Sequence, residues 1–331
     1  MENKKTIFSG VQPSGKLTLG NYLGAIKNWN ILQDEYDCIY CVVDMHAITQ
    51  RQEPAKLRAQ TLEVLAQYIA CGIDPLKSTI FIQSHVPAHA ELSWVLNCYT
   101  MYGELARMTQ FKDKSAKNAE NINAGLFTYP TLMASDILLY QTDLVPVGID
   151  QKQHVEICRN IATRFNSVYG DVFTMPDAYI GKVGAKIMSL QEPARKMSKS
   201  DENANSFILL TDKNEDIMRK FKRAVTDNNA KVFMGEDNLG IQNLMSIYSL
   251  ATGKTFDEIE NEFQGRGYGD FKPAVGEAVC EIVRPIREKT EDLLKNKDYL
   301  EQIYKEGALK AEHKARRTLD KVYKKVGFIK R

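Results

Sequence analysis

The first half of the chain alternates short hydrophobic runs with longer segments whose hydrophobic positions recur at helical spacing. The runs predict strands and the spaced segments predict helices. Strands are expected at 5–10, 37–44, 78–84 and 142–148, and helices at 20–33, 54–72, 90–102, 131–140 and 151–166. This β-α-β-α-β rhythm predicts an α/β fold, a doubly wound parallel sheet with helices on both faces.

The pattern changes near residue 190. The stretch "EPARKMSKSDENANS" (192–206) is polar and has no hydrophobic period, which indicates a loop. Beyond it almost every pattern is helical, with helices expected at 212–224, 241–251, 273–290 and 298–325. We therefore expect two domains, a sheet domain over 1–190 and a second domain over 191–331 that holds the polar loop and the helices.

Composition says little about the functional class of the protein. The chain has 331 residues, of which 44% are hydrophobic and 26% charged, so it can bury a sizeable core. A net charge of +2 gives no overall signature of nucleic-acid binding. Residues 305–331 hold ten Lys or Arg against three Asp or Glu. A solvated helix face and an RNA-contacting stripe both remain open for this basic end.

The sequence also argues against several classes. Its charged start does not resemble a signal peptide, and no hydrophobic run is long enough to cross a bilayer. Six scattered cysteines fit a reducing compartment, so we expect a cytoplasmic protein with no membrane partner. Cys38 and Cys41 form a C-x-x-C inside a predicted strand, where they would lie on opposite faces as core thiols. We expect no metal site, and structural roles for the isolated histidines His46, His85, His89 and His154.

The turn "GVQPSGKLTLGN" (10–21) follows the first predicted strand and opens a helix. In a doubly wound sheet, ligands bind beyond the carboxyl ends of the strands, and a helix N-terminus suits phosphate. Glycines here let the backbone approach a ligand closely. The turn matches neither G-x-G-x-x-G nor a Walker loop, so a simple turn stays an alternative to nucleotide binding.

A second candidate is "RKMSKS", from Arg195 to Ser200. Lysine ammonium groups are compact charges suited to polyphosphate, although a solvated basic loop would have the same composition. The pentapeptide KMSKS is expected by chance in about one chain of this length in ten thousand, at average amino-acid usage.

KMSKS (Lys196–Ser200) resembles the second signature of class I aminoacyl-tRNA synthetases. Their first signature, His-Ile-Gly-His, follows the first strand, and this chain has Thr18-Leu19-Gly20-Asn21 there. The chain is similar in this departure to tryptophanyl-tRNA synthetases of bacterial type. Further likenesses are "VPVGIDQKQHVEICRNIATRF", "DMHAIT", "FIQSHVPAHAELSW" and "YPTLMASDILLY", and the similarity covers essentially the whole chain.

This resemblance implies a Rossmann-like catalytic domain and a helical C-terminal domain that binds the tRNA anticodon. It implies a tryptophan–tRNA ligase that forms tryptophanyl-adenylate and pyrophosphate from L-tryptophan and ATP, then transfers tryptophan to tRNA(Trp). Mg²⁺ and a homodimer are also implied. The chain is too short for the large editing domain inserted in the Ile, Val and Leu enzymes. The tyrosine enzyme and a tRNA-binding paralogue without catalysis remain the two alternatives.

The resemblance also assigns the ATP site. The expected catalytic residues are Thr18, Asn21, Lys114, Lys196 and Lys199. The expected ATP-binding residues are Gln12, Pro13, Ser14, Gly20, Asn21, Gly148, Ile149, Asp150, Ile187, Lys196, Met197, Ser198, Lys199 and Ser200. For Lys114 a solvated loop lysine stays open.

Substrate choice is expected to rest on "YPTLMASDILLY". Tyr129, Met133 and Asp136 share one helix face, and a carboxylate in such a stripe needs a partner when it is buried. An indole N–H is a donor-only partner, although an Arg or another N–H of the fold would also serve. The resemblance implies that Asp136 binds the indole nitrogen. It implies the further tryptophan-binding residues Phe8, His46, Tyr129, Met133, Val145, Val147 and Gln151, with Tyr129 and Gln151 at the α-amino group.

Overall fold

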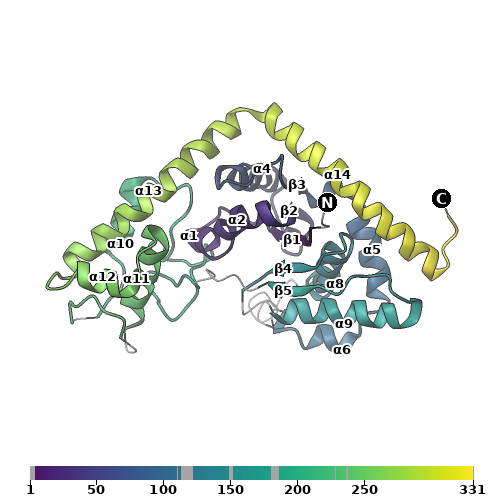
Figure 1. Cartoon of the computed structure of the whole chain (residues 1–331), viewed down its shortest axis with the longest axis horizontal. Coiled ribbons are helices and arrows are strands. Elements are labelled where there is room, and N and C mark those ends of the chain that lie inside the picture. Colours follow the sequence, from purple (N-terminus) through teal and green to yellow (C-terminus); the bar gives the residue numbers. More distant parts are fainter. Residues whose placement is uncertain are drawn as a thin grey trace.

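A computed structural model of the chain describes residues 4–109, 111–112, 122–148, 152–179, 186–227, 229–235 and 238–330. Five parallel strands form one sheet in the order β3-β2-β1-β4-β5, with helices around it (Figure 1). The strands are β1 (Thr6–Val11), β2 (Asp37–Val42), β3 (Thr79–Ile82), β4 (Leu144–Pro146) and β5 (Asp177–Tyr179). The predicted α/β class is confirmed. The sequence missed β5 because three residues show no period.

The helices follow the predicted rhythm. They are α1 (Leu19–Asn21), the π-helical η1 (Tyr22–Ile26), α2 (Lys27–Glu35), α3 (Asp44–Ala47), α4 (Pro54–Ala70), the 3₁₀ turn η2 (Gln83–His85), α5 (Ala88–Asn97), α6 (Tyr102–Ala106), α8 (Ala124–Leu138), α9 (Lys152–Tyr169), α10 (Asn214–Lys222), α11 (Leu239–Thr252), α12 (Phe256–Glu262), α13 (Tyr268–Lys295) and α14 (Lys297–Val326).

Helix α8 begins earlier than the predicted start at residue 131. Asn123 caps it by accepting a hydrogen bond from Leu126 N at 3.0 Å, and Pro130 lies inside the helix. The prediction was wrong at this end because a proline reads as a helix boundary. Tyr129 and Asp136 therefore lie on one continuous helix.

Hydrophobic clusters cover both faces of the sheet. One contains Cys38, Trp29 and Tyr40, and the other contains Cys41 and Phe81. The two cysteines therefore lie on opposite faces, as predicted. Burial raises the pKa of Cys38 to about 11 and that of Cys41 well above its ordinary value, so both thiols stay protonated at neutral pH.

The last helix returns to the sheet. Figure 1 shows α13 and α14 as two long helices that arch over the molecule, and α14 packs against β3. Gly307 makes this possible, because a Cβ there would lie 1.8 Å from the carbonyl oxygen of Ile80.

Several cations of the basic end attach α14 to the rest of the fold. Lys314 pairs with Asp37 at 2.5 Å, and Lys321 and Lys325 donate to the carbonyls of Asp171 and Tyr169 at 2.7 Å each. Part of the basic stripe thus binds protein. Among the described residues, no helix is long and hydrophobic enough to span a membrane.

Candidate active site

The site lies where the strand order reverses, between β1 and β4. Ligands of doubly wound sheets bind at such a switch point, beyond the carboxyl ends of the strands. The hydroxyl of Tyr68 on α4 fixes the end of β1, since it accepts from Val11 N at 2.9 Å and donates to Cys41 O at 3.1 Å. The turn that leaves β1 is thereby anchored to β2 before it reaches the first signature segment.

Thr18 and Asn21 form a reciprocal cap at the start of α1. Thr18 Oγ1 accepts from Asn21 N at 3.2 Å, and Asn21 Oδ1 accepts from Thr18 N at 2.9 Å. This capping box satisfies two N–H groups and sets where the helix begins. Thr18 is buried and Asn21 is exposed, so only Asn21 presents its side chain to solvent.

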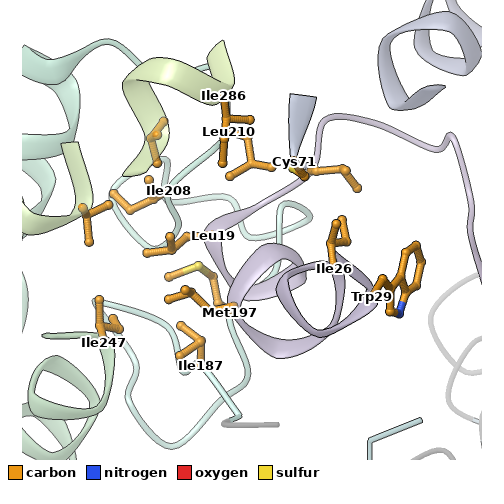
Figure 2. Close-up of a cluster of buried hydrophobic side chains, with 14 of the residues drawn as sticks. Leu19, Ile26, Trp29, Cys71, Ile187, Met197, Ile208, Leu210, Ile247 and Ile286 are labelled. Carbon is orange, nitrogen blue, oxygen red and sulfur yellow. The ribbon is translucent and has the colours of Figure 1, made fainter. Parts of the chain in front are cut away.

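Met197 anchors the second signature segment, the KMSKS loop (Lys196–Ser200). Its side chain is buried beside Leu19 and Ile187 (Figure 2), and its N–H donates to Ile187 O at 3.0 Å. A Cβ on Gly20 would lie 3.6 Å from the Cβ atoms of Ile187 and Met197. The structure thus packs the two signature segments against each other, although they lie almost 180 residues apart.

Lys199 lies over the Pro13–Gly15 turn. Gly15 has φ +136°, and a Cβ there would lie 3.2 Å from Cδ, Cε and Nζ of Lys199. Burial lowers the pKa of the Lys199 ammonium, and the charge of Glu63 on α4 opposes this shift. Burial likewise raises the pKa of the Glu63 carboxyl, against the effect of Lys16 and Lys199. Two cations and one carboxylate therefore surround the turn.

The remaining expected ATP residues differ in exposure. Pro13 is buried and Gln12 half-buried, whereas Ser14, Gly148, Lys196, Ser198 and Ser200 are exposed. The side chains of Ile187 and Met197 belong to a hydrophobic cluster. Ser198 Oγ accepts from Ser200 N at 3.2 Å. Lys114, Ile149, Asp150 and Gln151 lie outside the described residues.

A second polar centre surrounds Asp136, whose side chain is buried. Oδ1 accepts from Gln83 Nε2 at 2.7 Å and His89 Nδ1 at 2.6 Å, and Oδ2 accepts from His46 Nε2 at 2.7 Å. Burial raises the pKa of this carboxyl, but the two imidazoles outweigh burial and lower it to about 2. Asp136 is therefore an ionised acceptor inside the protein.

The sequence did not predict Gln83 and His89 as partners of Asp136. It allowed for a partner elsewhere in the fold, and the fold supplies three donors. Gln83 follows β3 and His46 lies on α3, directly after β2. The sequence places both residues at the carboxyl ends of neighbouring strands, and this could have marked them as site residues. The sequence gives no sign that they contact Asp136 on α8.

Four of the expected wall residues belong to one hydrophobic cluster or pack against it. Phe8 stacks on Tyr140 with ring centroids 5.5 Å apart, and Val145 is buried in the same cluster, against which Met133 and Val147 pack. The Tyr129 hydroxyl lies 2.9 Å from His154 Nε2, and burial raises its pKa well above the ordinary value. The Tyr129 ring meets the His46 ring edge-on at 6.4 Å.

These features define a class of protein. The parallel sheet reverses its strand order between β1 and β4, as nucleotide-binding sheets do. The two short signature segments pack against each other just after β1. A family model described as tRNA synthetases class I (W and Y) matches residues 1–284. The chain belongs to this family, within its bacterial tryptophan-type branch.

Relatives place it more closely. The chain is 59% identical over 328 residues to the tryptophan–tRNA ligase of Clostridium tetani, covering 99% of this chain and 97% of that protein. It is 58% identical over 329 residues to the tryptophan–tRNA ligase of Clostridium acetobutylicum, covering 99% and 98%. The sequence-based assignment is confirmed, and the chain is an aminoacyl-tRNA synthetase, an ATP-dependent ligase.

Solved structures agree. A tryptophanyl-tRNA synthetase from Mycoplasma pneumoniae matches with a TM-score of 0.92 and 34% identity, covering 98% of each chain. The enzyme from Campylobacter jejuni, complexed with ADP and tryptophan, matches with a TM-score of 0.84 and 35% identity, covering 98% of this chain and 100% of that one.

Proposed function

We propose that the chain activates L-tryptophan with ATP, forming tryptophanyl-adenylate and pyrophosphate, and then transfers tryptophan to tRNA(Trp). The observation that carries this proposal is the contact of the two signature segments, with Lys199 against Gly15 and Met197 against Gly20. The buried, ionised Asp136 lies beside the same sheet and supplies an acceptor for an amino-acid side chain.

The chemistry needs positioning and charge rather than a protein nucleophile. The tryptophan carboxylate oxygen attacks the α-phosphorus, an oxygen–phosphorus bond forms, and the bond to the departing pyrophosphate breaks. Negative charge then develops on the phosphoryl oxygens, where lysines and backbone N–H groups stabilise it. Lys196, Lys199 and Lys114 would supply the cations, and Gln12, Ser14 and Asn21 would bind the nucleotide.

Mg²⁺ would enter with ATP. Among the described residues, no group of three His, Cys, Asp or Glu side chains could hold a metal. In the proposed site Mg²⁺ would keep most of its waters and be held mainly by the phosphate oxygens of ATP, as it is in many nucleotide sites.

In the proposed pocket, Asp136 pairs with the indole N–H, and Tyr129 and Gln151 bind the α-amino group. Phe8, Met133 and Val145 line the ring with His46 and Val147. A site built to accept a hydrogen bond from an N–H rejects phenylalanine, because the phenyl ring offers Asp136 no donor. Tyrosine also donates, so ring size and shape must exclude it.

For the helical part, we propose that the residues after about 190 bind the tRNA anticodon and that no editing domain is present. We propose a homodimer as well. Trp94, Met101 and Tyr102 expose 70%, 51% and 76% of their area, and a second copy of the chain could bury these large side chains. The proposed location is the cytoplasm, where tRNA is charged.

Amino-acid-dependent exchange of labelled pyrophosphate into ATP, without tRNA, tests the activation step. Exchange with tryptophan alone, among the twenty amino acids, would support the proposal. Exchange with tyrosine would keep the enzyme class and overturn the pocket. No exchange with any amino acid, from folded protein with Mg²⁺, would favour a paralogue that binds tRNA without catalysis.

A further inference from the structure

Donors from the described residues leave one acceptor position on the carboxylate of Asp136. A carboxylate offers about four such positions, two on each oxygen. Gln83 and His89 donate to Oδ1, and His46 donates to Oδ2. Within the described part of the chain, Oδ1 is therefore filled, and Oδ2 can accept once more.

Each ring nitrogen of His89 has a hydrogen-bond partner. Ionised Asp136 can only accept, so His89 Nδ1 must carry the proton that it shares at 2.6 Å. On the other side, His89 Nε2 lies 2.7 Å from the Tyr140 hydroxyl. Burial raises the pKa of Tyr140 well above its ordinary value, so the hydroxyl stays protonated and can pair with Nε2 either as donor or as acceptor. Tyr140, His89 and Asp136 are thus joined in one series of hydrogen bonds.

Further contacts hold His89 and Tyr140 in place. The carbonyl of His89 accepts from Ser135 Oγ at 2.7 Å, which joins α5 to α8 next to Asp136. The Tyr140 ring stacks on Phe8 of β1, with an angle of 8° between the planes. Both side chains are buried, with His89 fully covered, so neither can exchange its partner for water.

We propose that His89, held by Tyr140, is a positioning residue that fills Oδ1 of Asp136 and reserves the last acceptor position, on Oδ2, for the side-chain N–H of the substrate. This inference rests on the proposed function, in which Asp136 pairs with indole. His89 does not touch the substrate. It acts by fixing the rotation of the carboxylate, so that a charge-assisted hydrogen bond is available in one direction only.

The test compares L-tryptophan with L-3-benzothienylalanine, an isostere in which sulfur replaces the indole N–H. The measured quantity is the ratio of kcat/KM for the two in pyrophosphate exchange. Tyr140→Phe should lower this ratio about threefold and His89→Leu more than about tenfold, because a displaced Asp136 loses part of its bond to the N–H. Nearly all of the loss should fall on tryptophan, with the isostere's kcat/KM changed less than about twofold.

His85→Leu is the matched control. His85 is an exposed imidazole four residues earlier that lies against Tyr304, with centroids 5.1 Å apart. It should leave the ratio unchanged. His89→Asn places an amide donor near the former Nδ1 and should restore much of the ratio lost in His89→Leu. If His89→Leu fails to fold, as judged by circular dichroism, Tyr140→Phe and His89→Asn decide.

Equal losses for both substrates would show that His89 only supports the fold and would overturn the inference, as would an unchanged ratio in the folded variants. Asp136→Ala, which leaves no side-chain acceptor, separates this failure from failure of the proposed function. If Asp136→Ala removes the discrimination while the His89 and Tyr140 variants keep it, only this inference falls. If Asp136→Ala also keeps it, the indole assignment itself is wrong, and the inference falls with it.

Discussion

The two polar centres of the site are built in different ways. The Asp136 centre is buried and joined by hydrogen bonds to three residues, each from a different segment of the chain. The KMSKS loop has four exposed or half-buried residues, and the buried side chain of Met197 and several backbone hydrogen bonds hold it in place. A rigid centre suits recognition of a fixed ring, whereas lysines on an exposed loop can follow phosphates whose charge distribution changes during reaction.

The largest effect should come from the rigid centre. Asp136→Ala is expected to lower kcat/KM for tryptophan in pyrophosphate exchange by on the order of a thousandfold, because it removes the acceptor of the substrate N–H. It also leaves three buried donors without their acceptor, at a cost of about 3 kcal/mol in the free energy of unfolding. Normal tryptophan kinetics in this variant, or a gain of tyrosine use, would remove the pocket assignment.

A change in the KMSKS loop should affect the rate of adenylate formation rather than the binding of tryptophan. Lys199→Ala is expected to slow adenylate formation about a hundredfold with little change in the dissociation constant of tryptophan, because its ammonium acts on the phosphates. Single-turnover kinetics and equilibrium binding measure the two quantities. Lys213→Ala, at an exposed lysine, is the control. A loss of tryptophan affinity equal to the loss of rate would contradict the separation of the two centres.

The anchor of the loop should matter less. Met197→Ala removes buried volume beside Leu19 and Ile187 and should lower the free energy of unfolding by about 2 kcal/mol. It should raise KM for ATP about tenfold and leave KM for tryptophan nearly unchanged, because only the loop loses its support. Met197→Leu keeps the volume and should restore most of both losses. Unchanged ATP kinetics in a destabilised Met197→Ala would separate the anchor from catalysis.

The smallest effect concerns Glu63. Its charge opposes the burial-induced lowering of the Lys199 pKa, so Glu63→Gln should lower that pKa further. The protonated lysine is the active form, and the alkaline limb of the pH–rate profile should therefore move to lower pH. The rate of pyrophosphate exchange, measured against pH at saturating tryptophan, gives the position of this limb. A limb that moves to higher pH, or one that Lys199→Ala leaves in place, would show that another group sets it.

Local pattern predicted most of the elements, and the exceptions have physical causes. The strands at 5–10 and 37–44 were predicted because each is a compact hydrophobic run. The short β5 and α12 were missed because a few residues cannot display a period. The start of α8 was misplaced because Pro130 reads as a boundary, although Asn123 caps the helix about two turns earlier.

In the candidate site, too, the sequence predicted single residues from local signals but not their contacts with distant segments. Asp136 was expected from a carboxylate in a hydrophobic stripe, which is a local signal. Its partners His89 and Gln83 come from other segments and could not be paired with it from spacing. The basic end was left open between solvent and RNA, and only packing shows that Lys314, Lys321 and Lys325 contact the protein.

By itself, the sequence determined the order of strands and helices, the two signature segments and the family to which the chain belongs. These are properties of short stretches, where side-chain period and residue identity act within a few residues. Only the tertiary structure decided that Lys199 lies over Gly15 and that Gly307 seats the last helix on β3. It also decided that donors from the described residues leave one acceptor position on Asp136. Such contacts join residues up to about 230 positions apart, and they depend on how the elements pack together rather than on any local pattern.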